Sequence, residues 1–174
     1  MIHVCSLSRL DAVAASLDGF DLVTLLSPSH AGADWSRLVR NRHLDLTFHD
    51  IVEPTPDLVA PDAATIRAIL EFARSGPPAV PLLIHFWAGI SRSSAAAYVI
   101  ACDRNPGHET AIADELRRRA SFATPNRLMV QLADDLLGRR GAMVDAIARI
   151  GRGADAFEGV PYQLPKLWPV DANK

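Results

Sequence analysis

Short apolar runs alternate along this chain with stretches of helical periodicity. The apolar runs have the length of strands and lie at 2–5, 20–26, 44–48 and 80–86. Helical spacing of apolar residues occurs at 8–17, 62–75, 93–102, 109–120, 125–137 and 141–150. Strands that alternate with helices are typical of a parallel sheet with both faces covered. The pattern therefore predicts an α/β fold, a three-layer sandwich with a mostly parallel central sheet flanked by helices.

Local signals sharpen several of these elements. The run VPLLIHF at 80–86 is the most apolar and predicts a central strand. Asp62 follows a proline-punctuated loop, 49–61, and is placed to cap the helix after it. Ser8 is placed to open the first helix, with Asp11 completing an imperfect capping box.

Glycine and proline become frequent after residue 150. Both residue types interrupt regular structure. We therefore expect a single domain over residues 1–150 and an irregular C-terminal arm, 151–174, packed on it. Leu167 and Trp168 are the expected anchors of that arm.

Composition narrows the class of protein. The chain has 174 residues, of which 49% are hydrophobic and 22% charged, so one domain with a substantial core is expected. The formal net charge is −2, which gives no reason to expect nucleic-acid binding or attraction to a membrane surface. No apolar run approaches the ~20 residues that span a bilayer. The first residues lack the pattern of a secretory signal, and two cysteines make no disulfide framework. These features predict a soluble, cytoplasmic protein.

The segment 83–94 carries the clearest chemistry. A buried strand is followed by a short turn containing Gly89 and then by a serine-rich helix start. Backbone N–H groups in such a turn, together with the positive end of the helix dipole, form an anion site. Arg92 stands in the first helical turn, where a positive charge is unfavourable to the dipole. Its guanidinium offers a planar fork of donors to a phosphate or carboxylate.

This segment resembles the phosphate-binding loop of the cysteine-dependent protein tyrosine phosphatases, whose pattern is H-C-x-x-G-x-x-R-[ST]. His85, Gly89, Arg92 and Ser93 match that pattern, and the stretch WAGISRS suits the dual-specificity-like branch. The order of elements also fits the family up to about Leu137. The resemblance implies phosphate binding by the loop residues Phe86, Trp87, Ala88, Gly89, Ile90, Ser91 and Arg92.

One position departs from the family pattern. Phe86 stands where the family has the cysteine whose thiolate attacks phosphorus. A phenyl ring has no lone pair with which to attack. Cys5 lies in the first strand and Cys102 lies about two to three helical turns past the loop, so neither is placed to replace it. The cysteine mechanism is therefore expected to be absent.

The orientation of the Phe86 ring has two possible outcomes. The ring either fills the mouth of the loop, or it turns into the core and leaves the loop amides and Arg92 free. Forcing an oversized group into a packed core costs about 1–3 kcal/mol. We therefore expect the ring at the mouth of the loop.

The resemblance also implies a general acid. Asp50 matches that role by its position upstream of the loop, while Asp57 and Asp62 compete for it.

Four further residues have supporting roles. His85 is expected to be a buried structural histidine, and Asn126 a structural hydrogen-bonding residue or helix cap. Ser93 assists the leaving thiolate in the family, but here it can equally cap the helix. Trp87 either lines the pocket or fills the underside of the loop.

These residues predict a pseudophosphatase: a phosphatase-like protein with a remnant anion-binding loop at 85–93 and no cysteine-dependent hydrolysis. A phosphorylated protein or another phosphate-bearing compound is its expected ligand, with no cofactor and no metal. Two alternatives stay open. The natural protein could be an active tyrosine or dual-specificity phosphatase in which Phe86 is an engineered change. A serine hydrolase using Ser91 is the other, because Gly89-Ile90-Ser91 partly matches a nucleophile elbow.

Overall fold

The computed structural model describes residues 1–30, 34, 35, 38 and 41–168. A five-stranded sheet with the order β3-β2-β4-β1-β5 forms its centre. The strands are β1 (Ile2–Ser6), β2 (Asp21–Leu26), β3 (His43–Thr47), β4 (Leu82–Phe86) and β5 (Tyr162–Leu164). β1 to β4 run parallel, and β5 pairs antiparallel with β1 at the edge. The predicted mostly parallel sheet is confirmed, with β4 in the centre.

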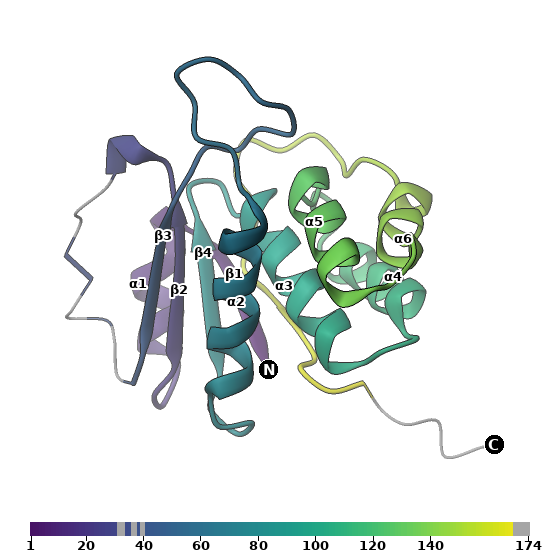
Figure 1. Cartoon of the computed structure of the whole chain (residues 1–174). Coiled ribbons are helices and arrows are strands. Elements are labelled where there is room, and N and C mark those ends of the chain that lie inside the picture. The colour runs from purple at the N-terminus through teal and green to yellow at the C-terminus, as the bar shows by residue number, and fades with distance from the viewer. Residues whose placement is uncertain (31–33, 36–37, 39–40, 169–174) are drawn as a thin grey trace.

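In the described part of the chain, six α-helices cover the two faces of this sheet (Figure 1). They are α1 (Leu10–Ala15), α2 (Ala63–Ser75), α3 (Arg92–Arg104), α4 (Glu109–Arg119), α5 (Arg127–Leu137) and α6 (Ala142–Ile150). Short 3₁₀ turns occur at Leu7–Arg9 and Pro28–His30. The α/β sandwich expected from the sequence is therefore the observed architecture.

The two faces of the sheet are covered unequally. A small apolar cluster packs α1 on one face, and a large cluster packs α2 to α6 on the other. Every residue of α3 from Arg92 to Cys102 is buried, so this helix lies within the larger layer with protein on all sides. Its Ala-rich sequence fits that position, because small side chains allow close approach of neighbouring helices and strands.

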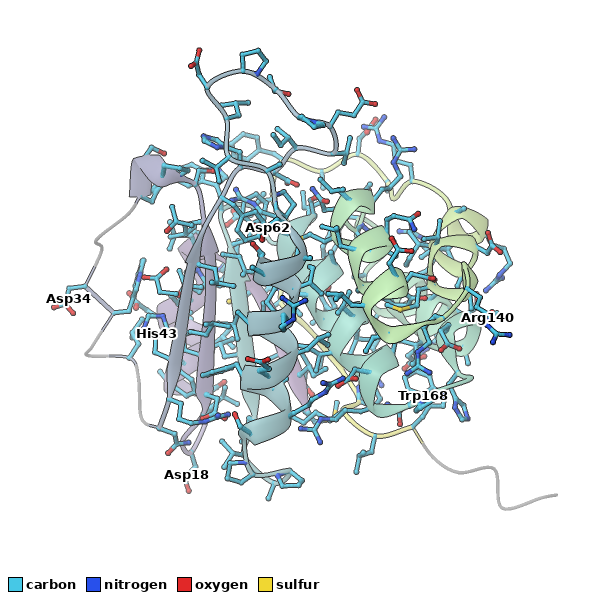
Figure 2. All side chains as sticks on the ribbon, in the orientation of Figure 1. Asp18, Asp34, His43, Asp62, Arg140 and Trp168 are labelled. Atoms are coloured by element: carbon cyan, nitrogen blue, oxygen red, sulfur yellow. The ribbon has the colours of Figure 1, made fainter. Side chains whose placement is uncertain are left out.

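Several helix ends follow from local sequence. The Asp62 carboxylate accepts the N–H of Thr65 at 2.8 Å and forms the N-cap of α2, as predicted; Figure 2 labels it at the start of that helix. Ser8 is not the N-cap of α1 as predicted, because Arg9 occupies that position. The backbone there makes a 3₁₀ turn before α1, and the Ser8 hydroxyl donates to Glu158 instead.

The C-terminal region differs from the irregular arm that we expected. It contains β5, a strand too short to give a sequence signal, which extends the sheet beside β1. Trp168, labelled in Figure 2, packs against the main core as predicted, and its backbone N–H donates to the Asn105 side-chain oxygen at 2.7 Å. The prediction for Leu167 is wrong, because that side chain is 63% exposed. Residues 169–174 lie outside the described part of the chain.

Parallel strands end at one edge of the sheet, and this edge gathers the chemistry. β4 leads there into the 86–92 loop, and β3 leads into the loop 49–61. The segment 151–161 crosses the same end of the molecule on its way to β5 (Figure 1). No helix within the described residues has the length and apolar character needed to cross a membrane.

Candidate functional site

The 86–92 loop joins β4 to α3 and turns its carbonyl groups outward. Four of these carbonyls accept hydrogen bonds from backbone N–H groups of other segments. The N–H of Leu7 donates to the Trp87 carbonyl at 3.2 Å, and that of Gly159 to the Ala88 carbonyl at 2.8 Å. The N–H of Thr124 donates to the Ile90 carbonyl at 3.1 Å, and that of Asn126 to the Ser91 carbonyl at 3.4 Å. These bonds fix the direction of the loop peptides from outside.

The loop N–H groups are left on the opposite, inner side. Within the described residues, no N–H from Trp87 to Ser91 has a backbone acceptor. The first N–H groups of α3, with the positive end of its dipole, adjoin them. Gly89 has a φ of 69°, and a Cβ there would lie 2.8 Å from the Ser6 nitrogen, so only glycine fits. Converging N–H groups at a helix start form an anion-binding loop.

Arg92 is buried beneath this loop, with 2% of its surface exposed. Its guanidinium donates to the Phe48 carbonyl and, at 3.0 Å, to the Ser27 hydroxyl. No carboxylate of the described residues forms a salt bridge with it, and its Nε has no hydrogen-bond partner. Burial lowers the pKa of Arg92 to about 10, an effect that the nearby Asp50 charge opposes. The side chain is therefore a buried cation at neutral pH without a paired anion.

Phe86 lies against this cation. The Arg92 guanidinium carbon is 4.0 Å from the centroid of the Phe86 ring, the distance of a cation–π contact. The ring is 7% exposed but belongs to neither apolar cluster of the core. The ring therefore lies against the arginine of the loop, and its position at the mouth of the loop stays a prediction.

Asp50 reaches the loop from the segment that follows β3. Its Oδ1 accepts hydrogen bonds from the Ser91 hydroxyl and from the Asn126 side-chain nitrogen, both at 2.8 Å. Asn126 also donates to the Ile51 carbonyl at 3.2 Å, and its own Oδ1 accepts the N–H of Met129 to cap α5. One amide thus ties the acid-bearing loop to the start of α5, and Asp50 is held beside the 86–92 loop.

The competing carboxylates lie elsewhere. Asp62 is occupied as the cap of α2, and Asp57 sits in the exposed part of the loop with a φ of 63°. The geometry therefore favours Asp50 as the carboxylate available to the site.

The serine-hydrolase alternative finds no support in the geometry. Ser91 donates to Asp50, and no hydrogen bond joins it to a histidine in the described part of the chain, which includes all six histidines. Without a base of that kind the hydroxyl is not activated for attack.

His85 is fully buried behind the loop, at the end of β4. Its Nε2 hydrogen-bonds the Thr24 hydroxyl at 2.8 Å, and the same hydroxyl meets Nε2 of His43 at 2.9 Å. Burial, followed by the charge of His43, lowers the pKa of His85 to about 3. The ring therefore stays neutral near pH 7, which suits a structural support of the strand that leads into the loop.

Neither cysteine is available as a nucleophile. Cys5 is 1% exposed and Cys102 fully buried, and burial raises the pKa of Cys5 to about 12 and that of Cys102 further still. Both thiols are thus protonated at neutral pH and inaccessible.

Ser93 does not cap α3, contrary to that reading of it. Ser91 occupies the N-cap position, while Ser93 lies inside the helix with a buried hydroxyl that has no hydrogen-bond partner. Trp87 is 53% exposed and its ring lies 5.1 Å from that of His30, so it borders the outer rim of the loop. Among the described residues, no group of His, Cys, Asp and Glu side chains could hold a metal ion.

Several residues that hold the site in place come from distant segments of the chain, and no sequence pattern predicted their contacts with it. Ser27 and Phe48 hold Arg92, Thr24 holds His85, and Gly159 holds the loop backbone. A Cβ on Gly159 would lie 2.3 Å from the Phe122 ring, so the C-terminal segment packs tightly here. The glycine itself was a visible signal, but nothing in the sequence connects it to residue 88.

Comparison with known proteins identifies solved structures that have the same fold as this chain. No protein-family model and no curated protein matches the chain. A crystal structure of PTPMT1 in complex with PI(5)P matches with a TM-score of 0.61 and 11% identity, covering 86% of this chain and 94% of that one. The active form of Tk-PTP matches with a TM-score of 0.50 and 22% identity, covering 76% and 86%. The chain therefore has the α/β fold of the protein tyrosine phosphatase superfamily, as the resemblance predicted.

Proposed function

We propose that this protein is a pseudophosphatase, a phosphatase-like domain that does not hydrolyse phosphoesters by the cysteine mechanism. The observation that carries the proposal is the stacking of the Phe86 ring on Arg92, at the position of the family nucleophile. A ring at this position supplies no attacking atom and occupies space that a phosphate group would need.

The remaining parts of an anion site support the phosphatase ancestry in this proposal. Outward carbonyls leave the loop N–H groups facing inward, and Arg92 keeps a positive charge beneath them. Arg92 Nε, the Ser93 hydroxyl and His85 Nδ1 are buried without partners around the loop. Such groups are rare in native proteins and mark places that bind ligands or solvent.

The ligand in this proposal carries a phosphate group. PTPMT1, which shares the fold, has been crystallised with PI(5)P, a phosphoinositide. Binding of a phosphate in the loop of this chain requires the Phe86 ring to move off Arg92. The cytoplasmic location stays a prediction from the sequence.

Hydrolysis of an aryl phosphate tests the proposal in three proteins: the chain as it stands, Phe86→Cys and Phe86→Ser. We expect no turnover from the chain as it stands. Phe86→Cys supplies a thiolate within the loop and gains activity at least 10³-fold above the background, within the range that covalent catalysis with electrostatic stabilisation provides. Phe86→Ser opens the same space without a thiolate and is expected to stay inactive, which separates chemistry from access.

Two additional variants identify the supporting residues. In the Phe86→Cys background, Arg92→Met should abolish the gained activity, and Asp50→Asn should lower it by about 10²-fold for a poor leaving group. Thermal unfolding of each variant shows whether it folds. Activity in the unmodified chain, or inactivity of a folded Phe86→Cys variant, would overturn the proposal of a phosphatase site that lacks only its nucleophile.

A further inference from the structure

A groove of about 750 Å³ opens beside the 86–92 loop, between α5, α6 and the loop 49–61. We call it the α5–α6 groove. Its lining is mainly apolar and includes Val52, Val130, Val144, Ile147 and Ala148. Ser91 and Asp50 of the candidate site line one end of the groove, but Phe86 and Arg92 do not, so the groove borders the loop without including the space that the ring occupies. Its volume is in the range of small-molecule sites.

Polar groups gather at one end of the groove. Arg127 is the first residue of α5, and Arg152 follows the end of α6, so these two antiparallel helices bring both guanidinium groups to the same end. Arg127 is exposed and makes no hydrogen bond or ion pair with the described residues, while Arg152 pairs only with the exposed Asp155 at 2.6 Å. Two weakly engaged cations thus stand at the entrance.

The Asp50 carboxylate lies at this end too, but its charge is engaged. Oδ1 accepts two hydrogen bonds, from Ser91 and Asn126. The polar end therefore has two guanidinium groups and two carboxylates, of which Arg152 and Asp155 pair with each other and Asp50 is already hydrogen-bonded. The guanidinium of Arg127 is left without a partner among the described residues, and this free cationic donor favours a hydrogen-bonding anion over a cation.

The apolar part extends away from these cations along the helices. α6 ends at Ile150, close to Arg152 at the cationic end of the groove. Val144 lies six residues earlier, which corresponds to about 9 Å along the helix axis. Val130 and Ile147 face the same space from the two helices and are themselves buried. A flexible chain reaching Val144 from the cationic end would remain in contact with apolar side chains along that length.

We infer that the α5–α6 groove binds an anionic amphiphile, a compound with one phosphate or carboxylate headgroup and an unbranched apolar tail. The headgroup meets Arg127 and Arg152, and the tail lies against Val130, Val144 and Ile147. This binding does not require the 86–92 loop to admit a phosphate, so it stands apart from the proposed loss of catalysis.

Isothermal titration calorimetry of the whole chain with four probes tests the inference. The probes are octyl phosphate, octanoate, inorganic phosphate and octanol, each below its micelle concentration. We expect octyl phosphate or octanoate to bind at least tenfold more tightly than inorganic phosphate and octanol. The tighter of the two identifies the headgroup. Equal affinity for octyl phosphate and inorganic phosphate, or for octanol and both anions, overturns the inference.

Substitutions then locate the binding. Ala148→Phe fills the groove from an exposed helical position and should weaken binding of the preferred anion at least tenfold. Arg127→Glu should weaken it at least fivefold and leave octanol unaffected. Ala111→Phe on α4 and Arg67→Glu on α2 make the same changes at other exposed helical positions and should alter affinity less than twofold.

Ala148→Phe and Phe86→Ser together decide where the anion binds. Thermal unfolding shows whether each of these variants folds. Unchanged affinity in Ala148→Phe places the ligand elsewhere and overturns the inference. Loss of binding in Phe86→Ser with no effect of Ala148→Phe assigns the anion to the 86–92 loop instead. Neither result bears on whether the unmodified chain hydrolyses aryl phosphates.

Discussion

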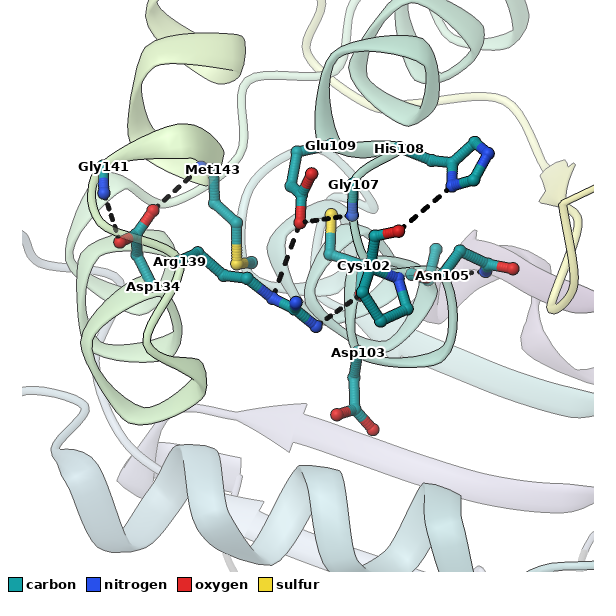
Figure 3. Close-up of polar contacts among 12 residues, drawn as sticks. Cys102, Asp103, Asn105, Gly107, His108, Glu109, Asp134, Arg139, Gly141 and Met143 are labelled. Carbon is teal, nitrogen blue, oxygen red and sulfur yellow. Dashed lines mark hydrogen bonds and ion pairs between the residues drawn. The ribbon is translucent and has the colours of Figure 1, made fainter.

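The two ends of α3 differ in the partners that they give an arginine: Arg92 is buried at the start of the helix, whereas Arg139 beside the other end is partly exposed. At its start, Arg92 has backbone and hydroxyl acceptors and an aromatic ring, but no carboxylate partner within the described residues. Near its end, Arg139 pairs with Glu109 at 3.5 Å and also donates to the Cys102 carbonyl at 3.3 Å (Figure 3). Both arginines have an Nε without a hydrogen-bond partner, so the difference is one of charge: among the described residues, only the second arginine is matched by a carboxylate.

The neighbours of Arg139 are satisfied in the same way. Asp134 accepts the N–H groups of Gly141 and Met143 at 2.7 and 2.8 Å and so stabilises the start of α6 (Figure 3). Glu109 also accepts the N–H of Gly107 at 3.2 Å. A cluster whose charges compensate one another holds helices together. A buried cation without a carboxylate, beneath inward N–H groups, is instead what the proposed function expects of an anion site.

Replacing each arginine by methionine should reveal the largest difference in the free energy of unfolding between the two regions. Arg139→Met leaves the Glu109 carboxylate buried with one backbone donor, and we expect a loss of about 3 kcal/mol in the free energy of unfolding. Arg92→Met loses the hydrogen bonds to the Phe48 carbonyl and the Ser27 hydroxyl but also removes a buried cation that has no carboxylate partner. These two effects oppose each other, so we expect a net change of less than about 1 kcal/mol. Urea unfolding measures both. Equal losses would show that Arg92 is structural to the same degree.

Acid should weaken the loop end through His85. Its pKa is about 3 in the folded state, below the ordinary value of 6.5 that it regains on unfolding. The unfolded chain therefore binds the proton more readily below pH 6.5, and stability that is complete above that pH is lost as the pH falls toward 3. Between pH 7 and 5 the loss from this group is about 2 kcal/mol. His85→Gln should remove that part of the pH dependence in urea unfolding; an unchanged slope would contradict the assignment.

Replacing one glycine in each region by alanine, Gly107 and Gly89, should give the smallest difference in stability between the two regions. Gly107 has a φ of 85° with nothing within 4 Å of a Cβ, so Gly107→Ala costs only the left-handed backbone, about 1 kcal/mol. Gly89→Ala adds a Cβ at 2.8 Å from the Ser6 nitrogen, and we expect about 2–3 kcal/mol in total. Thermal unfolding of the two variants compares them. A loss no larger at Gly89 than at Gly107 would mean that the loop and β1 can separate without cost.

The sequence was informative where structure depends on neighbouring residues. Apolar runs predicted β1 to β4, and the caps of α2 and α5 were visible as Asp62 and Asn126. The resemblance that His85, Gly89, Arg92 and Ser93 carry implied the phosphatase fold, which the structure has. β5 escaped prediction because three residues carry no periodicity and its pairing with β1 joins residues far apart in the chain.

Residue types and their order were therefore enough to determine the parallel sheet, its helices and the absence of a cysteine at position 86. Only the tertiary structure decided that the Phe86 ring stacks on Arg92, that Asp50 rather than Asp62 reaches the loop, and that α5 and α6 leave an apolar groove beside it. Local patterns report backbone propensity and burial, because these depend on a few adjacent residues. The direction of a side chain depends on which distant segments fill the space around it, and that is settled only when the chain packs.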